Sequence, residues 1–122
     1  MSTIAVDAMG GDSAPKEIVK GAIFAKENGV DVILSGDKGL IETYLEGVKI
    51  PVVDYPEVIS MEDNPARAIR TKKNASILGA LQLVKENKAD GVFSAGSTGA
   101  TLVGSISTVS YTHLTLPTIL LV

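Results

Sequence analysis

The chain has 122 residues, of which 45% are hydrophobic and 20% charged, which suits one compact globular domain and is too short for two. Its net charge of −3 argues against a general attraction to nucleic acid, and the absence of cysteine excludes disulfides, thiolate metal sites and cysteine nucleophiles. A single histidine, His113, excludes a multi-histidine metal cluster. The amino-terminal residues carry no basic region and no long apolar run, so we expect a cytoplasmic protein without a signal peptide.

The predicted elements alternate between short apolar strands and amphipathic helices. Strands are expected at 3–7, 30–34, 50–53 and 92–95, where β-branched residues gather between turn residues. A first helix should begin at Pro15, with Asp12 or Ser13 as its cap, and end at Gly29. Further helical patterns follow at 40–45, from Pro65 to about Lys72, from a cap at Asn74 to Lys88, and from the start of 100–106.

No charged residue follows Asp90, which raises the question of a membrane span. Serine, threonine, glycine and proline interrupt this segment, and no continuous apolar block approaches the ~18 residues that a span needs. We therefore expect no membrane-spanning segment.

The order of the elements predicts the fold class. Strands that alternate with helices and are apolar along most of their length are typical of a parallel sheet buried on both faces. We expect an α/β fold with three layers, a mainly parallel sheet with helices on either side.

Two glycine-rich turns are candidate binding sites, because the carboxyl ends of parallel strands share one edge of the sheet, where ligands of such folds bind. The first turn contains Gly10 and Gly11, and the second contains Gly96, Ser97, Thr98 and Gly99. The second turn is the better anion site, since it combines hydroxyls with backbone N–H groups at a helix start. The alternative is that both turns only connect their elements tightly, and neither matches a Walker A or dinucleotide-binding pattern.

Asp7 and Asp12 flank the first turn. Carboxylates repel phosphate, so these residues are expected to cap the helix or to orient their neighbours. A divalent metal held by both is the alternative, although the sequence offers no third ligand.

Basic residues gather at Arg67, Arg70, Lys72 and Lys73. The spacing of Arg67, Arg70 and Lys73 predicts that these three share one helix face. That face is either a solvated helix surface or a cationic wall that meets an anionic substrate or an acidic partner protein. Glu62 and Asp63, just before this segment, look like ordinary surface charge.

Four segments resemble the phosphate acyltransferases of bacterial membrane-lipid synthesis. They are IAVDAMGGD at 4–12 with Ala14-Pro15, GDK at 36–38, the Arg/Lys/Asn stretch at 65–74, and SAGSTGA at 94–100. The resemblance implies a fold akin to phosphotransacetylases and isocitrate-dehydrogenase-like enzymes. It also implies a homodimer, without a cofactor, that works in the cytoplasm or loosely at the membrane.

The implied reaction is the attack of inorganic phosphate on the thioester of acyl-acyl carrier protein, which gives acyl phosphate for phospholipid synthesis. Such a site needs N–H donors and cations more than it needs an ionised base. On this resemblance, the candidate phosphate- or substrate-binding residues are Gly10, Gly11, Gly96, Ser97, Thr98, Gly99, Arg67, Arg70, Lys73 and Asn74. The basic residues would also suit acyl carrier protein, which is strongly acidic.

The chain departs from the family in two respects. Ser97 stands where the family usually has asparagine, and family members are about three times as long. The match stops after Ser107, and 109–118 (VSYTHLTLPT) resembles a translated sequencing-library transposon end. We therefore expect residues 1–107 to be the amino-terminal part of an acyltransferase domain whose sheet is incomplete. Residues 108–122 are expected to be a non-native tail that adds nothing to the sheet.

Two other functional readings stay open. The chain could be a small phosphate- or nucleotide-binding α/β module without catalysis, which the glycine-rich turns and the short length favour. It could also be a truncated product with no function of its own.

Overall fold

The computed structural model describes residues 2–60, 62–96 and 118–120. The elements follow in the order β1 (Thr3–Asp7), α1 (Lys16–Glu27), β2 (Asp31–Gly36), α2 (Lys38–Leu45), β3 (Val52–Asp54), α3 (Pro65–Thr71), α4 (Ser76–Lys85), β4 (Gly91–Ser94) and β5 (Thr118–Leu120). The helix predicted to begin in 100–106 lies outside the described residues.

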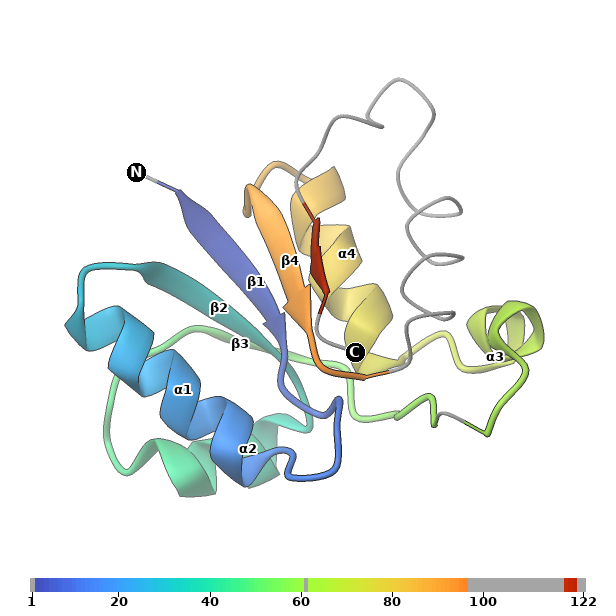
Figure 1. Ribbon diagram of the computed structural model, residues 1–122, viewed down its shortest axis with the longest axis horizontal. Helices are drawn as coiled ribbons and strands as arrows, with labels where there is room; N and C mark the ends of the chain where they lie inside the picture. The colour runs from blue at the N-terminus through green and yellow to red at the C-terminus, as the bar shows by residue number, and fades with distance from the viewer. Residues whose placement is uncertain (1, 61, 97–117, 121–122) are drawn as a thin grey trace.

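The strands form one sheet in the order β3-β2-β1-β4-β5, and every neighbouring pair is parallel. Helices α1 and α2 cover one face, and α4 covers the other (Figure 1). The central position belongs to β1, whose Val6 lies in register with Leu34 of β2 and Phe93 of β4. The predicted α/β class, a parallel sheet with helices on both faces, is confirmed.

Each face of the sheet has its own apolar core. On the α1 side, Val19 and Ile41 are fully buried against Leu34. On the α4 side, Leu81 packs with Ala5 and Val92, which point to the opposite face because side chains alternate along a strand. This two-sided burial explains why the strands are apolar along most of their length.

Two helices begin at side-chain caps. The Asp37 carboxylate accepts a hydrogen bond from the Leu40 N–H at 3.2 Å at the start of α2. The Asn64 side chain accepts one from the Arg67 N–H at 3.0 Å, and Pro65 takes the first position of α3, where no N–H is needed.

Two expected caps are wrong. No side chain caps α1, whose N-cap residue is Pro15; the Ser13 carbonyl, not its hydroxyl, accepts a hydrogen bond from the Glu17 N–H at 3.1 Å. Asn74 does not cap α4, because the helix starts later, at Ser76 after Ala75. The backbone of Asn74 is instead bonded to Glu57, which fixes it one residue before the cap position.

The expectation that residues 108–122 add nothing to the sheet does not hold for Thr118–Leu120. These residues form β5, in register with Val92–Ser94 of β4. Without it, β4 would present a row of unpaired N–H and C=O groups, which any uncharged extended segment can satisfy. The division of the chain into a family segment and a non-native tail stays a prediction.

In the described part of the chain, no helix combines the length and the apolar character required to cross a bilayer.

Helix α4 lies close to the sheet at Gly79. A Cβ atom at this position would overlap the Ser35 hydroxyl and the Tyr55 ring. That hydroxyl is buried and donates a hydrogen bond to the Ser76 carbonyl at 2.7 Å, which ties the first turn of α4 to β2. A larger residue would therefore force the helix away from the strand.

We predict opposite effects for alanine at two helical glycines. Gly79→Ala should lower the free energy of unfolding by a net ~1 kcal/mol or more, because overlap in a packed core outweighs the gain in helix propensity. Gly21→Ala, in α1, should raise it by about 0.5–1 kcal/mol, since nothing lies within 4 Å of the added atom. Urea denaturation of both variants measures the difference, and equal changes would contradict the close packing of α4.

Candidate functional site

The two glycine-rich turns meet at the carboxyl edge of the sheet. A Cβ atom on Gly10 would lie 2.9 Å from the Gly96 nitrogen and 2.9 Å from an Asp7 carboxylate oxygen. Gly11 has φ +96°, and a Cβ there would lie 3.2 Å from the Ala95 Cβ. Glycine is therefore required by close approach at Gly10, and by both approach and backbone conformation at Gly11.

A buried carboxylate joins these turns. Asp7, the last residue of β1, accepts hydrogen bonds from the Met9 N–H at 3.1 Å and from the Ser94 hydroxyl at 3.1 Å. The same hydroxyl accepts a hydrogen bond from the Gly96 N–H at 3.1 Å. Asp7 and Ser94 thus form a clasp that holds the turn after β1 against the turn after β4.

Burial raises the pKa of the Asp7 carboxyl above its ordinary value of 3.8, although hydrogen bonding by the Ser76 side chain, and then by Met9 and Ser94, works against the rise. The residue is 4% exposed. A charged form would have little water around it, and the described residues place no cation beside it. Asp7 therefore serves the turns as an acceptor of hydrogen bonds, not as a partner of an ion pair.

Asp12 stands apart from this clasp. It is exposed, whereas Asp7 is buried, and it does not cap α1. Within residues 2–60, 62–96 and 118–120, no three acidic or histidine side chains are grouped as a metal ion would require. The metal alternative at Asp7 and Asp12 gains no support from this arrangement.

The N–H of Gly96 points into the clasp, so it is not available to a ligand at the edge of the sheet. Gly10 and Gly96 instead provide the close backbone contact between the turns. Ser97, Thr98 and Gly99 lie outside the described residues, as does His113.

The predicted basic face is only partly correct. Arg67 and Arg70 are exposed on α3, but this helix ends at Thr71, so Lys73 lies beyond it and does not continue the face. Figure 1 shows α3 beside the sheet, apart from the turn after β1. The helix that carries Arg67 and Arg70 therefore lies apart from the first glycine-rich turn.

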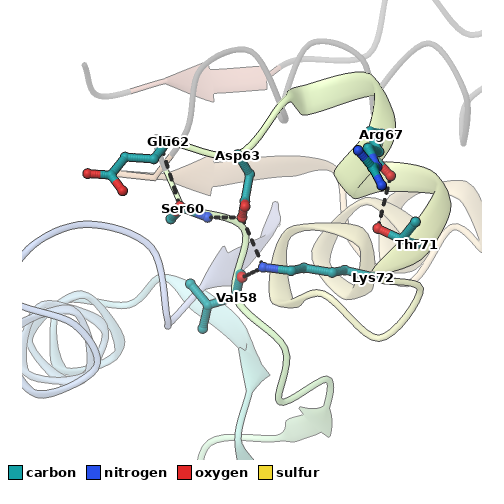
Figure 2. A network of polar contacts seen from close by, with 7 residues as sticks. All are labelled: Val58, Ser60, Glu62, Asp63, Arg67, Thr71 and Lys72. Carbon is teal, nitrogen blue, oxygen red and sulfur yellow. Dashed lines mark hydrogen bonds and ion pairs between the residues drawn. The ribbon is translucent and has the colours of Figure 1, made fainter.

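Lys72 and Asp63 hold α3 against the preceding loop (Figure 2). The Lys72 ammonium lies 2.9 Å from the Asp63 carboxylate and donates a hydrogen bond to the Val58 carbonyl at 2.9 Å. The same carboxylate oxygen accepts a hydrogen bond from the Ser60 N–H at 2.9 Å. The hydrogen bond from Lys72 is the main reason why the pKa of Asp63 is lowered. Asp63 is thus a structural partner, not the ordinary surface charge that the sequence suggested.

A family model described as "fatty acid synthesis protein" matches residues 2–121. The chain belongs to this family. Among its relatives are proteins named phosphate acyltransferase from Desulforamulus reducens, 52% identical over 87% of this chain, from Clostridioides difficile, 48% identical over 87%, and from Pediococcus pentosaceus, 51% identical over 84%. The chain spans about a third of the length of these relatives, 33%, 33% and 30%.

Ser94 was not among the site residues that we predicted from the sequence. It ends β4 as Asp7 ends β1, and the two residues lie on the same face of adjacent strands. A polar residue that closes an otherwise apolar strand was the available signal. Its pairing with Asp7 depended on β1 and β4 being neighbours, which the sequence does not state.

The raised pKa of Asp7 predicts a pH dependence of stability. The folded chain holds this proton to higher pH than the unfolded chain, so stability from this group is full below about pH 4 and falls as pH rises through the folded pKa. As pH rises through the folded pKa, the free energy of unfolding of the wild type should fall relative to that of Asp7→Asn. Above that pKa the difference between the two chains should become constant. Urea midpoints of both chains between about pH 3.5 and about pH 8 test this. A difference that grows in favour of the wild type with pH would contradict it.

Proposed function

We propose that the full-length parent of this chain transfers the acyl group of acyl-acyl carrier protein to inorganic phosphate. The product, acyl phosphate, would feed phospholipid synthesis. The observation that carries the proposal is the similarity, at about half identity, to proteins named phosphate acyltransferase along nearly the whole chain. The proposal extends to the parent because the chain spans only about a third of their length.

The chemistry requires donors for anions. A phosphate oxygen attacks the thioester carbonyl carbon, a new C–O bond forms, and the C–S bond breaks as the carrier's thiolate leaves. This thiolate is a good leaving group, since its basicity is that of a thiol with a pKa of about 8.5. The remaining demand is for preorganised N–H and hydroxyl donors at the former carbonyl oxygen.

The turns at the carboxyl edge supply the framework for such donors. We assign phosphate or thioester positioning to the segment from Gly96 to Gly99, with Ser97 and Thr98 as hydroxyl donors. The Asp7–Ser94 clasp supports this assignment, because it fixes the start of that segment against the Gly10 turn.

The basic residues on α3 suit a different task. Arg67 and Arg70 are exposed on α3, which lies apart from the turn after β1 (Figure 1), so we assign them to the acidic surface of acyl carrier protein. We assign Lys73, which is also exposed, to the same contact with acyl carrier protein. Asn74, the next residue in this loop, is assigned with it. In this proposal the parent is a cytoplasmic homodimer with at most peripheral contact with a membrane.

The donor assignment is tested at Thr98 in the intact parent. Thr98→Val should lower kcat/KM for acyl phosphate formation by about 10²–10³, the usual cost of one lost preorganised donor. Ser97→Asn is the matched variant: it lengthens a donor and should keep or raise kcat/KM. The 122-residue chain alone is the control and should show no turnover. A Thr98→Val enzyme within a few-fold of wild type would remove the turn from the site.

Charge reversal on α3 tests the carrier contact separately. In the intact parent, Arg67→Glu and Arg70→Glu should each raise KM for acyl-acyl carrier protein about fivefold to tenfold, leave KM for phosphate unchanged, and flatten the dependence of kcat/KM on salt. Lys49→Glu changes charge equally at an exposed loop position away from α3, and should have little effect. Equal effects of all three substitutions would reduce α3 to a solvated surface.

A further inference from the structure

Helix α1 contains a glycine, Gly21, although no contact in the described part of the chain requires glycine there. Gly21 lies in the middle of α1, is exposed, and has nothing within 4 Å of the place where a Cβ would be. Glycine at such a position costs about 1 kcal/mol relative to alanine. Glycine in a helix is usually retained where another element packs closely against it. No described element comes within 4 Å of the Cβ position at Gly21.

An apolar groove lies directly beside Gly21. It has a volume of about 400 Å³, and among the described residues that line it only Glu17 is charged. Ile18, Gly21 and Ala25, spaced by three and four residues, form its α1 side. Its floor is formed by Val30, which precedes β2, and by four strand residues: Ile4, Val6, Val32 and Phe93.

The groove is wide because one face of the sheet is only partly covered. Helix α1 lies over β2, and α2 packs on β3, while α4 is on the other face (Figure 1). The α1 side of β1 and β4 is therefore left as the groove floor. Apolar side chains remain open around it: Val30 is 39% exposed, and Phe24, three residues beyond Gly21 on α1, is 69% exposed. Exposed apolar surface of this kind marks a site that another element covers.

The handedness of parallel connections indicates where that element comes from. The steps from β1 to β2 and from β2 to β3 place α1 and α2 on one face, while the return step to β4 places α4 on the opposite face. After β4, a right-handed connection reaches the α1 face again only where the chain runs back across the sheet toward β3. The covering element therefore comes from a part of the parent that follows β4 and returns across the sheet.

We propose that this groove is the docking surface for an apolar-faced helix from the carboxyl-terminal two thirds of the parent protein, which packs against α1 at Gly21. The relatives contain the required length, since this chain matches only 33% of the D. reducens protein. The absence of a side chain at Gly21 lets two helix backbones approach closely. The inference does not depend on the acyl-transfer proposal, because it concerns how the parent's parts pack and its test measures no activity.

Cysteine labelling in the intact parent tests the proposal, because this segment has no cysteine of its own. Gly21→Cys places a thiol at the groove, and Lys20→Cys places one on the adjacent, outward-facing position of the same helix. Maleimide labelling of Gly21→Cys should be at least about tenfold slower than that of Lys20→Cys, since it must wait for local opening. The unsubstituted parent gives the background from cysteines elsewhere.

Leucine substitutions give the complementary readout. In the 122-residue chain, Gly21→Leu should leave Tm unchanged or raise it by a few degrees, because the position is open and leucine favours helix. In the parent it should lower Tm by about 3 °C or more, or prevent folding, while Lys20→Leu changes Tm by less than about 2 °C.

Two results would overturn the proposal. One is equal labelling of the two thiols in the parent, which would show that the groove stays open. The other is protection of Gly21→Cys that disappears when the parent is diluted until it dissociates, which would show that a second copy covers the groove.

Discussion

The hydrogen bond between Ser94 and Asp7 is the interaction on which the candidate site depends. It joins the ends of two central strands, and through Met9 and Gly96 it fixes both turns that follow them. The bond needs no charge partner, since the burial that raises the pKa of Asp7 also strengthens a hydrogen bond by excluding water. Gly10 and Gly96 complete the arrangement, because any side chain at Gly10 would enter the space that the clasp occupies.

Much of the fold follows from the sequence, because local rules and the parallel-sheet pattern agree. The apolar runs at β1 and β4 and the helical spacing in α1 each predict their element within about two residues of its observed bounds. Pro65 was sufficient to place the start of α3, since proline is accepted at a first helical position. The strand order was not predicted, because it depends on which apolar faces meet and not on any one segment.

The site was predictable in its location but not in its internal contacts. Glycine-rich turns after β1 and β4 indicated the edge of the sheet, yet the use of the Gly96 N–H by Ser94 depends on atoms far apart in the sequence. The basic stretch shows the same limit. Regular spacing put Lys73 on a helix face, but α3 ends at Thr71, and Lys72 turns back to bind Asp63. Spacing rules hold only as far as the helix continues.

The central position of β1 has a consequence for how the chain folds. Strand β1 is made before its two partners: it pairs with β2, which follows within a few tens of residues, and with β4, whose contacts to β1 span 87 residues along the chain. The unit β1-α1-β2-α2-β3 can form early from local contacts, whereas closing the distant pairing costs loop entropy before it gains any contact. During synthesis the backbone groups on one edge of β1 therefore stay unpaired until β4 and the turn at Gly96 have been synthesised.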